Sequence, residues 1–416
     1  MKGAAAGVLL VLLTGLGAGC TGDEGAKPVE TSSCGRMLYE GGGKPDVLVV
    51  SDFPFSGAAA EYTNTRLTLD AIEFVLRQRG FRAGDHRVGY QSCNSTVGTE
   101  DFNASVCRRN AHAYAATEDV VGMIGPLNSN CAAHQIPILS RKAAGPLAIV
   151  SPANTWAGLT LNLPGKSRSG DALYLDGVRN YARVVAHDRV QGRAAARLAK
   201  RLGARRVVLL RQVHVADDYA GGLAVPFVET AKGLGLQVSR FAWLRRGSYA
   251  RLAREVAATR PDAVFLAGLT QGNAKRLVED LRRELGWTTP FIGPDSFASA
   301  GVAAELGRAG EGLYATEAGI PPGKLPAGGR RFLRAFGRPS VEVEQSYAVE
   351  AAQATEVLLD AIGRSDGTRA SVVDELFATR VKNGILGSFA FDRYRDVVPA
   401  PVRIYRIRNG KLVAET

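Results

Sequence analysis

From Pro45 onward the sequence alternates between short apolar segments and longer amphipathic ones. The apolar segments are short and nearly continuous, which is typical of strands buried on both faces; they are 46–51, 86–93, 120–125 and 145–151. Between the first two, Asn64 to Gly80 places its apolar residues on one side of a helix. Strands that alternate with helices of this length predict a parallel sheet covered by helices on both faces.

The same alternation restarts after a polar, glycine-containing segment, 164–177. Four further strands are predicted, at 205–211, 236–243, 262–268 and 289–294, with helices that begin near Gln191, Tyr219, Ser248 and Gln271. A chain of 416 residues suits two domains better than one. We therefore expect two successive doubly wound α/β units, with a ligand cleft between them. The segments 343–362, 369–379 and 400–412 complete one or both sheets.

The charge balance does not indicate a nucleic-acid partner. Although the formal net charge is +12, the Lys and Arg residues are scattered over predicted helices, mostly near Asp or Glu. No basic block with interleaved aromatic residues is present in the sequence. With 46% hydrophobic and 22% charged residues, the composition is that of a globular protein with a solvated basic surface.

The first twenty residues predict export. They carry one Lys, an apolar core from Ala4 to Leu16 and small residues before Cys20, which together form a secretory signal too short for a stable membrane span. The ending Gly17–Cys20 resembles a lipobox, with Gly17 at the position usually held by Leu. We expect residues 1–20 to be a lipoprotein signal peptide, with Cys20 lipidated on the outer face of the cell membrane; ordinary signal cleavage is the alternative. Residues 21–44 are expected to be a polar tether.

Four cysteines remain in the exported chain: Cys34, Cys93, Cys107 and Cys131. An even number of cysteines in an exported protein predicts two disulfides, and the sequence leaves all three pairings open. A zinc site is disfavoured because the spacings are wide and no His stands at ligand spacing. We expect no metal and no cofactor.

Catalytic motifs are missing from the sequence. The five His residues are isolated, and no His-Glu-x-x-His, Cys-x-x-Cys or Gly-x-Ser-x-Gly occurs. The segment 164–170 (PGKSRSG) is similar to a phosphate loop, but Thr160 stands where the first Gly is required, so we interpret it as a flexible loop. The sequence predicts that the protein is not an enzyme.

Binding signals cluster where predicted strands end. Small polar residues followed by a helix occur at 51–57, 125–130, 151–155 and 293–297. Helix N-termini bind anions such as carboxylates, and Ser129 and Thr155 can add hydroxyl hydrogen bonds. Asp295, from the second unit, is placed to face a cation. Together these groups describe a pocket for an α-amino acid, although the same residue types are also ordinary helix caps.

The order of these segments carries a family resemblance. The series SDFPFSG, GMIGPLNSN, AIVSPANTWAGLT, NYARVVAHDRVQG, ADDYAGGL and FIGPDSF resembles the extracytoplasmic binding proteins of branched-chain amino acid ABC transporters over Pro45 to Lys411. The resemblance implies a type I periplasmic binding protein fold, an α/β architecture with two Rossmann-like doubly wound lobes joined by three crossovers. The implied lobes are 45–184 plus 320–388 and 187–317 plus 391–412. The crossovers are expected at 184–187, 315–321 and 389–392.

The resemblance also assigns roles to single residues. It implies that Ser129 binds the ligand carboxylate, that Ala153 and Thr155 hold carboxylate and ammonium, that Tyr219 forms an aromatic wall and that Asp295 pairs with the ammonium. Asp295 is shorter than the Glu that is common in the family. The implied pocket wall comprises Phe53, Phe55, Trp156 and Leu269. The familiar family disulfide suggests that Cys93 lies near Cys131, and a local Cys93–Cys107 pairing is equally compatible.

The resemblance implies a lipid-anchored protein that captures an amino acid or a similar small molecule and delivers it to an ABC permease. Two alternatives stand beside it. The same fold can serve as a sensor that signals to a partner, and a cleft Asp can serve a hydrolase or amidase.

Overall fold

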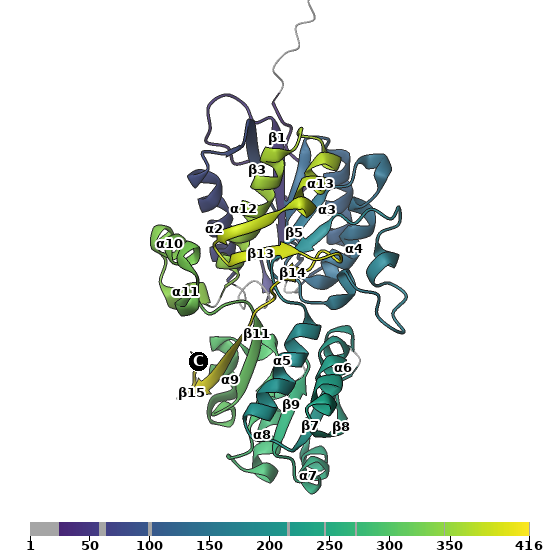
Figure 1. Ribbon diagram of the computed structural model, residues 1–416, viewed down its shortest axis with the longest axis vertical. Helices are drawn as coiled ribbons and strands as arrows, with labels where there is room; N and C mark the ends of the chain where they lie inside the picture. Colours follow the sequence, from purple (N-terminus) through teal and green to yellow (C-terminus); the bar gives the residue numbers. More distant parts are fainter. Residues whose placement is uncertain are drawn as a thin grey trace, which may run out of the picture.

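The computed structural model describes residues 25–57, 64–98, 102–213, 217–244, 247–270, 273–344 and 346–415, and it shows two α/β lobes stacked end to end (Figure 1). The predicted signal peptide, with Cys20, lies outside the described residues. Within these ranges, no helix is both long and apolar enough to cross a bilayer.

The first lobe is built on a six-stranded sheet of order β2-β3-β1-β4-β5-β6. Its strands are β1 (Val47–Phe53), β2 (Arg82–Ala83), β3 (His86–Asn94), β4 (Val120–Ile124), β5 (Ala148–Ser151) and β6 (Tyr181–Arg183). All are parallel except β2, which pairs with β3 in the antiparallel direction. The four strands predicted in this lobe are confirmed, and β2 and β6 are additions of two and three residues that are too short to give a pattern.

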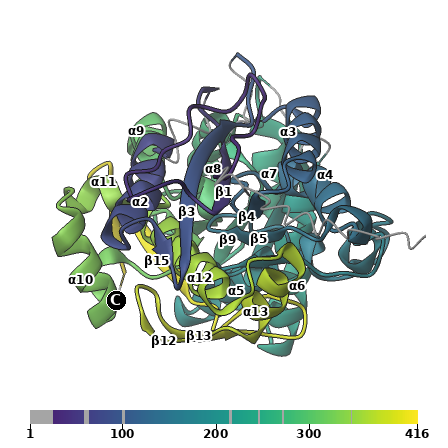
Figure 2. The same ribbon diagram turned by 90° about the horizontal axis from the view of Figure 1, so that it is seen from above.

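Helices cover both faces of this sheet, as the continuous apolar strands predict. Val47 and Val49 of β1 pack in one core cluster with residues of α2 (Thr65–Gln78), α12 (Ala348–Arg364) and α13 (Arg369–Ala378). Leu48 and Val50 pack on the opposite face against α3 (Ala104–Ala116) and α4 (Ser129–Leu139). Figure 2 shows these two groups of helices on either side of the strands. Both faces are buried because successive side chains of a strand point in opposite directions.

The second lobe is built on a seven-stranded sheet of order β16-β15-β11-β10-β9-β7-β8. Its strands are β7 (Arg206–Gln212), β8 (Gln237–Trp243), β9 (Ala263–Ala267), β10 (Phe291–Gly293), β11 (Tyr314–Ala318), β15 (Val402–Arg408) and β16 (Lys411–Ala414). Its helices are α5 (Asp188–Arg201), α6 (Asp217–Gly233), α7 (Ala250–Ala258), α8 (Ala274–Leu285) and α9 (Ala300–Leu306). The C-terminal hairpin β15–β16 therefore completes the second sheet, whereas α12 and α13 return to the first.

The chain passes between the lobes three times. The first crossing is 184–187, between β6 and α5, and the second leaves β11 at Gly319 toward α10 (Ala327–Phe336) and α11 (Ser340–Glu344). The third crossing lies at 399–401, later than the expected 389–392. The reason is a small sheet of β12 (Arg380–Gly384), β13 (Gly387–Phe391) and β14 (Val397–Val398), which keeps the chain on the first lobe. Val397 accordingly packs in the first lobe's core.

Residues 25–44, which were expected to belong to a free tether, lie along β3 instead. The backbone N–H of Val29 donates to Gln91 Oε1 at 2.8 Å, and Leu38 forms a β-bridge with Tyr90. Ala26 and Val29 are buried. The polar composition of this segment conceals its few apolar residues, whose partners lie far along the chain.

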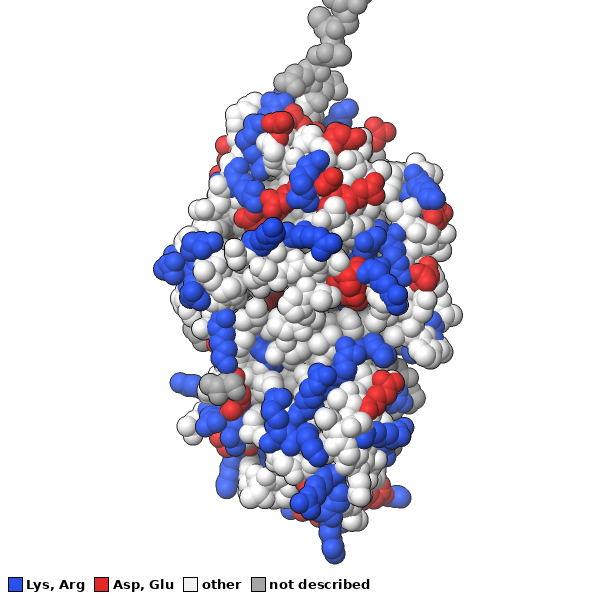
Figure 3. Space-filling view, in the orientation of Figure 1, with Lys and Arg blue, Asp and Glu red and all other residues white. Residues whose placement is uncertain are grey.

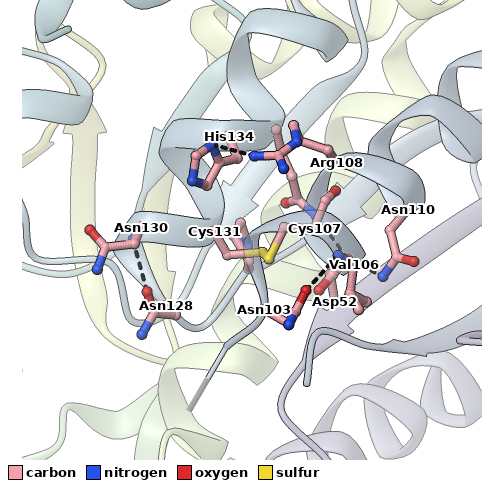
Figure 4. Close-up of a disulfide and its surroundings, with 12 residues drawn as sticks. Asp52, Asn103, Val106, Cys107, Arg108, Asn110, Asn128, Asn130, Cys131 and His134 are labelled. Atoms are coloured by element: carbon pink, nitrogen blue, oxygen red, sulfur yellow. Dashed lines mark hydrogen bonds between the residues drawn. A yellow bond between two sulfur atoms is a disulfide. The ribbon is translucent and has the colours of Figure 1, made fainter. Parts of the chain in front are cut away.

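Both disulfides are present, but with a pairing different from the two that were favoured. Cys34 pairs with Cys93, and Cys107 pairs with Cys131. The second bond joins α3 to α4 beside the buried carboxylate of Asp52 (Figure 4). The expected Cys93–Cys131 and Cys93–Cys107 pairings are therefore wrong, because the N-terminal segment runs along β3 and brings Cys34 to Cys93.

Removing either disulfide should destabilise the protein substantially. Replacing Cys34 and Cys93 together by Ser is expected to lower the free energy of unfolding by about 2–5 kcal/mol. The Cys107/Cys131 double variant should lose somewhat less, because its bond spans 24 residues rather than 59. Urea denaturation measures both losses, and peptide mapping without reduction checks the pairing. A linked peptide that contains Cys93 and Cys131 would contradict it.

The packing of α5 against α6 depends on one glycine. A Cβ added at Gly192 would lie 2.3 Å from the backbone oxygen of Leu223 in α6. Gly192→Ala is therefore expected to destabilise the protein by about 1–3 kcal/mol, since a backbone oxygen cannot rotate away. As a control, Gly221→Ala in α6 has nothing within 4 Å of the new Cβ and should stabilise it by about 0.5–1 kcal/mol. Equal thermal shifts for the two variants would contradict this.

Candidate ligand-binding site

The loops after β4 and β5 are locked together at the end of the first sheet. Ser151 Oγ accepts the backbone N–H groups of Ala153 and Asn154 and donates to the Pro126 carbonyl oxygen at 3.0 Å. The Asn154 side chain donates to the carbonyl oxygens of Pro126 and Leu127 at 2.9 and 2.7 Å. These bonds fix the backbone of the segment that carries Ala153 and Thr155.

Arg183 binds the rest of the β5 loop through hydrogen bonds. Its guanidinium is fully buried and donates to the carbonyl oxygens of Asn154 and Trp156 at 3.0 and 2.9 Å and to Thr160 Oγ1 at 2.6 Å. Its Nε donates to Asp396 Oδ1 at 2.7 Å, and Thr160 donates to Asp396 Oδ2 at 2.9 Å. One buried ion pair thus holds the loop near the first and third crossings.

The predicted site residues of the first lobe lie together on these loops. Ser129, the first residue of α4, is half-buried, and its Oγ accepts the backbone N–H of Trp156 at 3.3 Å. Ala153 and Thr155 are almost fully buried in the same loop. The loops after β4 and β5 therefore form one surface at the end of the sheet.

The expected pocket-wall residues have different surroundings. Phe53 is fully buried in the first lobe's core, whereas Phe55 is 43% exposed. Trp156 packs into the core on the α3–α4 side, although its Nε1 is buried without a hydrogen-bond partner among the described groups. Leu269, in the second lobe, is half-buried, and its backbone N–H donates to Gln212 Oε1 at 2.7 Å.

The second lobe contributes Tyr219 from α6 and Asp295 from the turn after β10. Tyr219 Oη donates to Asp295 Oδ1. The backbone N–H of Asp295 donates to Gln191 Oε1 at 3.3 Å. The backbone N–H of Ser296 donates to Asp295 Oδ1 at 2.9 Å. Burial raises the pKa of the Asp295 carboxyl, and the hydrogen bond from Tyr219 opposes that rise. The structure brings these two predicted residues into direct contact.

Contacts from both lobes converge at this point. Asp188, at the start of α5, donates its backbone N–H to the Thr155 carbonyl oxygen at 2.8 Å, and the Asp188 and Asp295 carboxyls act electrostatically on each other. Tyr347 lies just before α12 in the first lobe. Burial raises the pKa of Tyr347, and the charge of Asp295 raises it further. Sequence reasoning missed Asp188 and Tyr347 because neither stands at the end of a predicted strand.

A groove of about 770 Å³ lies between the segment 161–166 and α6, and none of the predicted ligand-binding residues lines it. Its lining comes from both lobes: Leu161, Asn162, Leu163, Pro164, Lys166, Arg189, Arg211, Gly221, Gly222, Val225, Glu229 and Tyr394. Gly222 links the groove to the acidic residues, because a Cβ there would lie 3.3 Å from Asp188 Oδ2. The described residues contain no group of three or more His, Cys, Asp or Glu side chains arranged to hold a metal ion.

A second buried acidic group lies at the second crossing. Arg403 of β15 donates to Glu317 Oε2 of β11 at 2.7 Å and lies 3.7 Å from Glu350 of α12, so it joins the two lobes. Burial raises the pKa of Glu317 to about 7, and burial also raises the pKa of Glu350. Two carboxyls thus share one guanidinium.

These buried carboxyls predict the pH dependence of the ligand-free protein. Because the folded pKa of Glu317 is about 7 and its ordinary value is 4.5, its contribution to stability is complete below pH 4.5 and is lost as the pH rises through 7. Burial also raises the pKa values of Asp188, Asp295 and Glu350. Burial lowers the pKa of His187 to about 3, which opposes this trend below pH 6.5, so the carboxyl effect is measured as a difference between variants. Relative to Glu317→Gln, the parent should gain melting temperature as the pH falls from neutral toward 4.5. The exposed Glu305→Gln should follow the parent, and a difference between the parent and Glu317→Gln that does not change with pH would contradict the prediction.

Two α/β lobes with three crossings and a groove lined by residues of both lobes define a two-lobed ligand-binding protein of the type I fold. The sequence model of the family described as "Periplasmic binding protein" matches residues 100–411, and the chain belongs to that family. It is a family of extracytoplasmic binding proteins rather than of enzymes. No curated protein matches this sequence.

Solved structures share the whole fold at low sequence identity. A leucine-binding protein from Thermotoga maritima superposes with a TM-score of 0.71 at 23% identity, over 89% of this chain and 98% of that one. An ABC transporter substrate-binding protein from Desulfitobacterium hafniense in complex with Leu superposes with a TM-score of 0.70 at 21% identity, over 89% of this chain and 99% of that one. An ABC transporter solute-binding protein from R. palustris in complex with benzoate superposes with a TM-score of 0.65 at 16% identity, over 88% of this chain and 95% of that one.

Proposed function

We propose that this protein captures an amino acid or an amino acid-like molecule between its lobes and delivers it to an ABC permease, while Cys20 carries a lipid anchor on the outer face of the cell membrane. The observation that supports this proposal most strongly is the hydrogen bond from the backbone N–H of Asp188, a buried acid of the second lobe, to the Thr155 carbonyl oxygen of the first lobe, with the buried acid Asp295 near enough to raise the pKa of Asp188. Hydrogen-bond donors on one side and acidic groups on the other match the two charges of an α-amino acid.

The proposed mechanism needs no covalent chemistry. The loops around Ser129, Ala153 and Thr155 bind the ligand carboxylate, and Tyr219 and Asp295 reach the ligand from the second lobe. A ligand that contacts both lobes stabilises the closed arrangement by its higher affinity for that state. The permease then distinguishes the closed form from the open one.

A second ligand class has a specific observation in its favour. The R. palustris protein of the same fold is in complex with benzoate, and a related one binds p-hydroxybenzoic acid. An aromatic acid would use the same carboxylate-binding loops, but it would offer no cation to Asp188 and Asp295. We therefore place the amino acid first.

A thermal-shift screen of the common L-amino acids and of simple aromatic acids, followed by calorimetry of the hits, tests the proposal. We expect at least one amino acid to raise the melting temperature. Stabilisation by aromatic acids alone would move the ligand to the second class. If no small molecule in the screen stabilises the protein, the proposed capture of such a ligand is wrong.

A further inference from the structure

The groove along α6 is separate from the strand-end loops, because none of the residues predicted to contact the ligand lines it. On α6, Gly221, Val225 and Glu229 line the groove and follow one another at intervals of four residues. They therefore share one face of the helix. Leu223 and Phe227 lie on another side of α6 and are buried in the core of the second lobe. The groove thus borders the side of α6 that the core leaves uncovered.

The wall from the first lobe includes part of the segment 164–170, whose sequence is similar to a phosphate loop. The backbone N–H of Lys166 donates to the Leu163 carbonyl oxygen at 3.1 Å and closes a turn. Ser169 Oγ accepts the backbone N–H of Leu163 and donates to the Lys166 carbonyl oxygen, both at 2.9 Å. The segment is folded on itself by these bonds, and it holds Leu163, Pro164 and Lys166 at the groove.

The charged side chains of the lining are mostly cationic. Lys166 comes from the first lobe, and Arg189 and Arg211 come from the second. The lining contains one acid, Glu229, which lies 3.7 Å from Arg189. Positive charge is therefore in excess along the groove, and it comes from both lobes. Such an excess favours a negatively charged group in the ligand.

Helix α5 extends this positive surface beside the groove. Arg189, Arg193 and Arg197 follow at intervals of four residues along the helix. Burial lowers the pKa of Arg193, and the positive charges of Arg189 and Arg197 lower it further. Figure 3 shows Lys and Arg side chains gathered over α5 and α6 in the lower lobe. An anion next to Arg189 reduces the repulsion among these cations.

Much of the remaining lining is apolar. Val225 of α6 is 52% exposed, and Leu161, Leu163 and Tyr394 of the first lobe are half-buried. A single exposed apolar side chain is ordinary, but here apolar side chains of both lobes border one groove. Its volume of about 770 Å³ lies in the range of small-molecule pockets, roughly 300–1,000 Å³. These features favour a ligand with an apolar body.

We propose that this groove is a second ligand site, which binds organic anions that combine one acidic group with an apolar body, as a medium-chain carboxylate does. Lys166, Arg189 and Arg211 attract the acidic group, and Val225 and Tyr394 contact the apolar body. The inference does not rest on the proposed function, since it uses none of the residues assigned to the amino acid. Because the walls belong to different lobes, an occupant contacts both of them.

Three probes test the ligand class by calorimetry on the full chain: decanoate, decylammonium and inorganic phosphate. Decanoate should bind. Decylammonium keeps the alkyl chain and reverses the charge, so it should bind at least about tenfold more weakly. Phosphate keeps the negative charge but buries no apolar surface, so it should also bind at least about tenfold more weakly.

Two substitutions of Val225 test whether decanoate binds in the groove. Val225→Glu adds negative charge to the lining and should weaken decanoate binding at least about tenfold. Val225→Lys loses the same apolar contact but adds positive charge, so it should bind decanoate at least as tightly as the parent. Because the Val225 side chain is exposed, both variants should fold like the parent, and their melting temperatures check this.

A second pair of variants fills space without changing charge. A Cβ added at Gly221, which lines the groove, meets nothing within 4 Å. Gly221→Leu should therefore occupy part of the groove and weaken decanoate binding at least about tenfold. Gly233→Leu is the matched control, since Gly233 lies at the end of the same helix with equally open surroundings and does not line the groove.

Each contrary outcome overturns the inference. Equal decanoate affinity in the parent, Val225→Glu and Gly221→Leu would mean that decanoate binds elsewhere, whatever the cleft between the lobes binds. Decylammonium or phosphate binding as tightly as decanoate would contradict the ligand class. If decanoate does not bind the parent at all, the second site is wrong, and the capture of an amino acid is unaffected because the thermal-shift screen tests it separately.

Discussion

Arg183→Met is expected to lower the free energy of unfolding by about 3–5 kcal/mol, the scale for removing one partner of a buried ion pair. The substitution leaves the buried carboxylate of Asp396 without its cation and removes the donors that hold the carbonyl oxygens of Asn154 and Trp156. Because those carbonyl groups flank Thr155, ligand affinity should fall together with stability. Urea denaturation and calorimetry measure the two effects.

Arg179→Met is the matched control for this prediction. Arg179 pairs with Asp171, whose side chain is largely exposed, and donates to the Thr160 carbonyl oxygen at 2.9 Å. Its loss should cost about 1 kcal/mol, because the exposed Asp171 stays hydrated and only one carbonyl oxygen loses its donor. If the two variants unfold at the same urea concentration, Arg183 does not have the structural role that its contacts indicate.

Removing either predicted polar contact should weaken ligand binding without unfolding the protein. Asp295→Ala and Thr155→Ala are each expected to reduce affinity by about 1–3 kcal/mol, the cost of leaving a buried polar partner unsatisfied. Asp295 holds its place through Tyr219 and Gln191, so its loss also frees the tyrosine hydroxyl. Calorimetry with the amino acid found in the screen measures the change.

Ser299→Ala provides the control in the second lobe. Ser299 caps α9 by accepting the Val302 N–H at 3.1 Å. Its replacement should lower the melting temperature and leave the dissociation constant unchanged. If Asp295→Ala and Thr155→Ala both bind like the parent, the site has been placed on the wrong residues.

The strands and helices were predictable because their signals are local. The β1 and β7 segments carry continuous apolar runs, and the helices after them repeat apolar residues on one face, so each element is specified within a short window. The strand-end loops are also specified by residues close together in the sequence. Ser151 forms the turn that its position at the end of β5 predicts, and Thr155 follows four residues later on the same loop.

Other features depended on residues that are far apart in the chain. The sequence predicted two disulfides and left their pairing open, and the pairings suggested beside the family resemblance were wrong, because nothing local shows that 25–44 lies along β3 and carries Cys34 to Cys93. The third crossing was placed too early because the small β12–β13–β14 sheet has no strong apolar alternation. Arg183 and Asp396 are 213 residues apart, and neither stands in a motif.

The sequence by itself determined two doubly wound α/β units and the strand-end loops that we propose bind the ligand. Periodicity and turn chemistry act over a few residues, and an exported chain with four remaining cysteines must pair them. The tertiary structure alone decided which cysteines meet, how Arg183 anchors the β5 loop and that Asp188 of the second lobe bonds to Thr155 of the first. Burial and charge pairing depend on contacts between distant segments, and those contacts exist only once both sheets and all three crossings are in place.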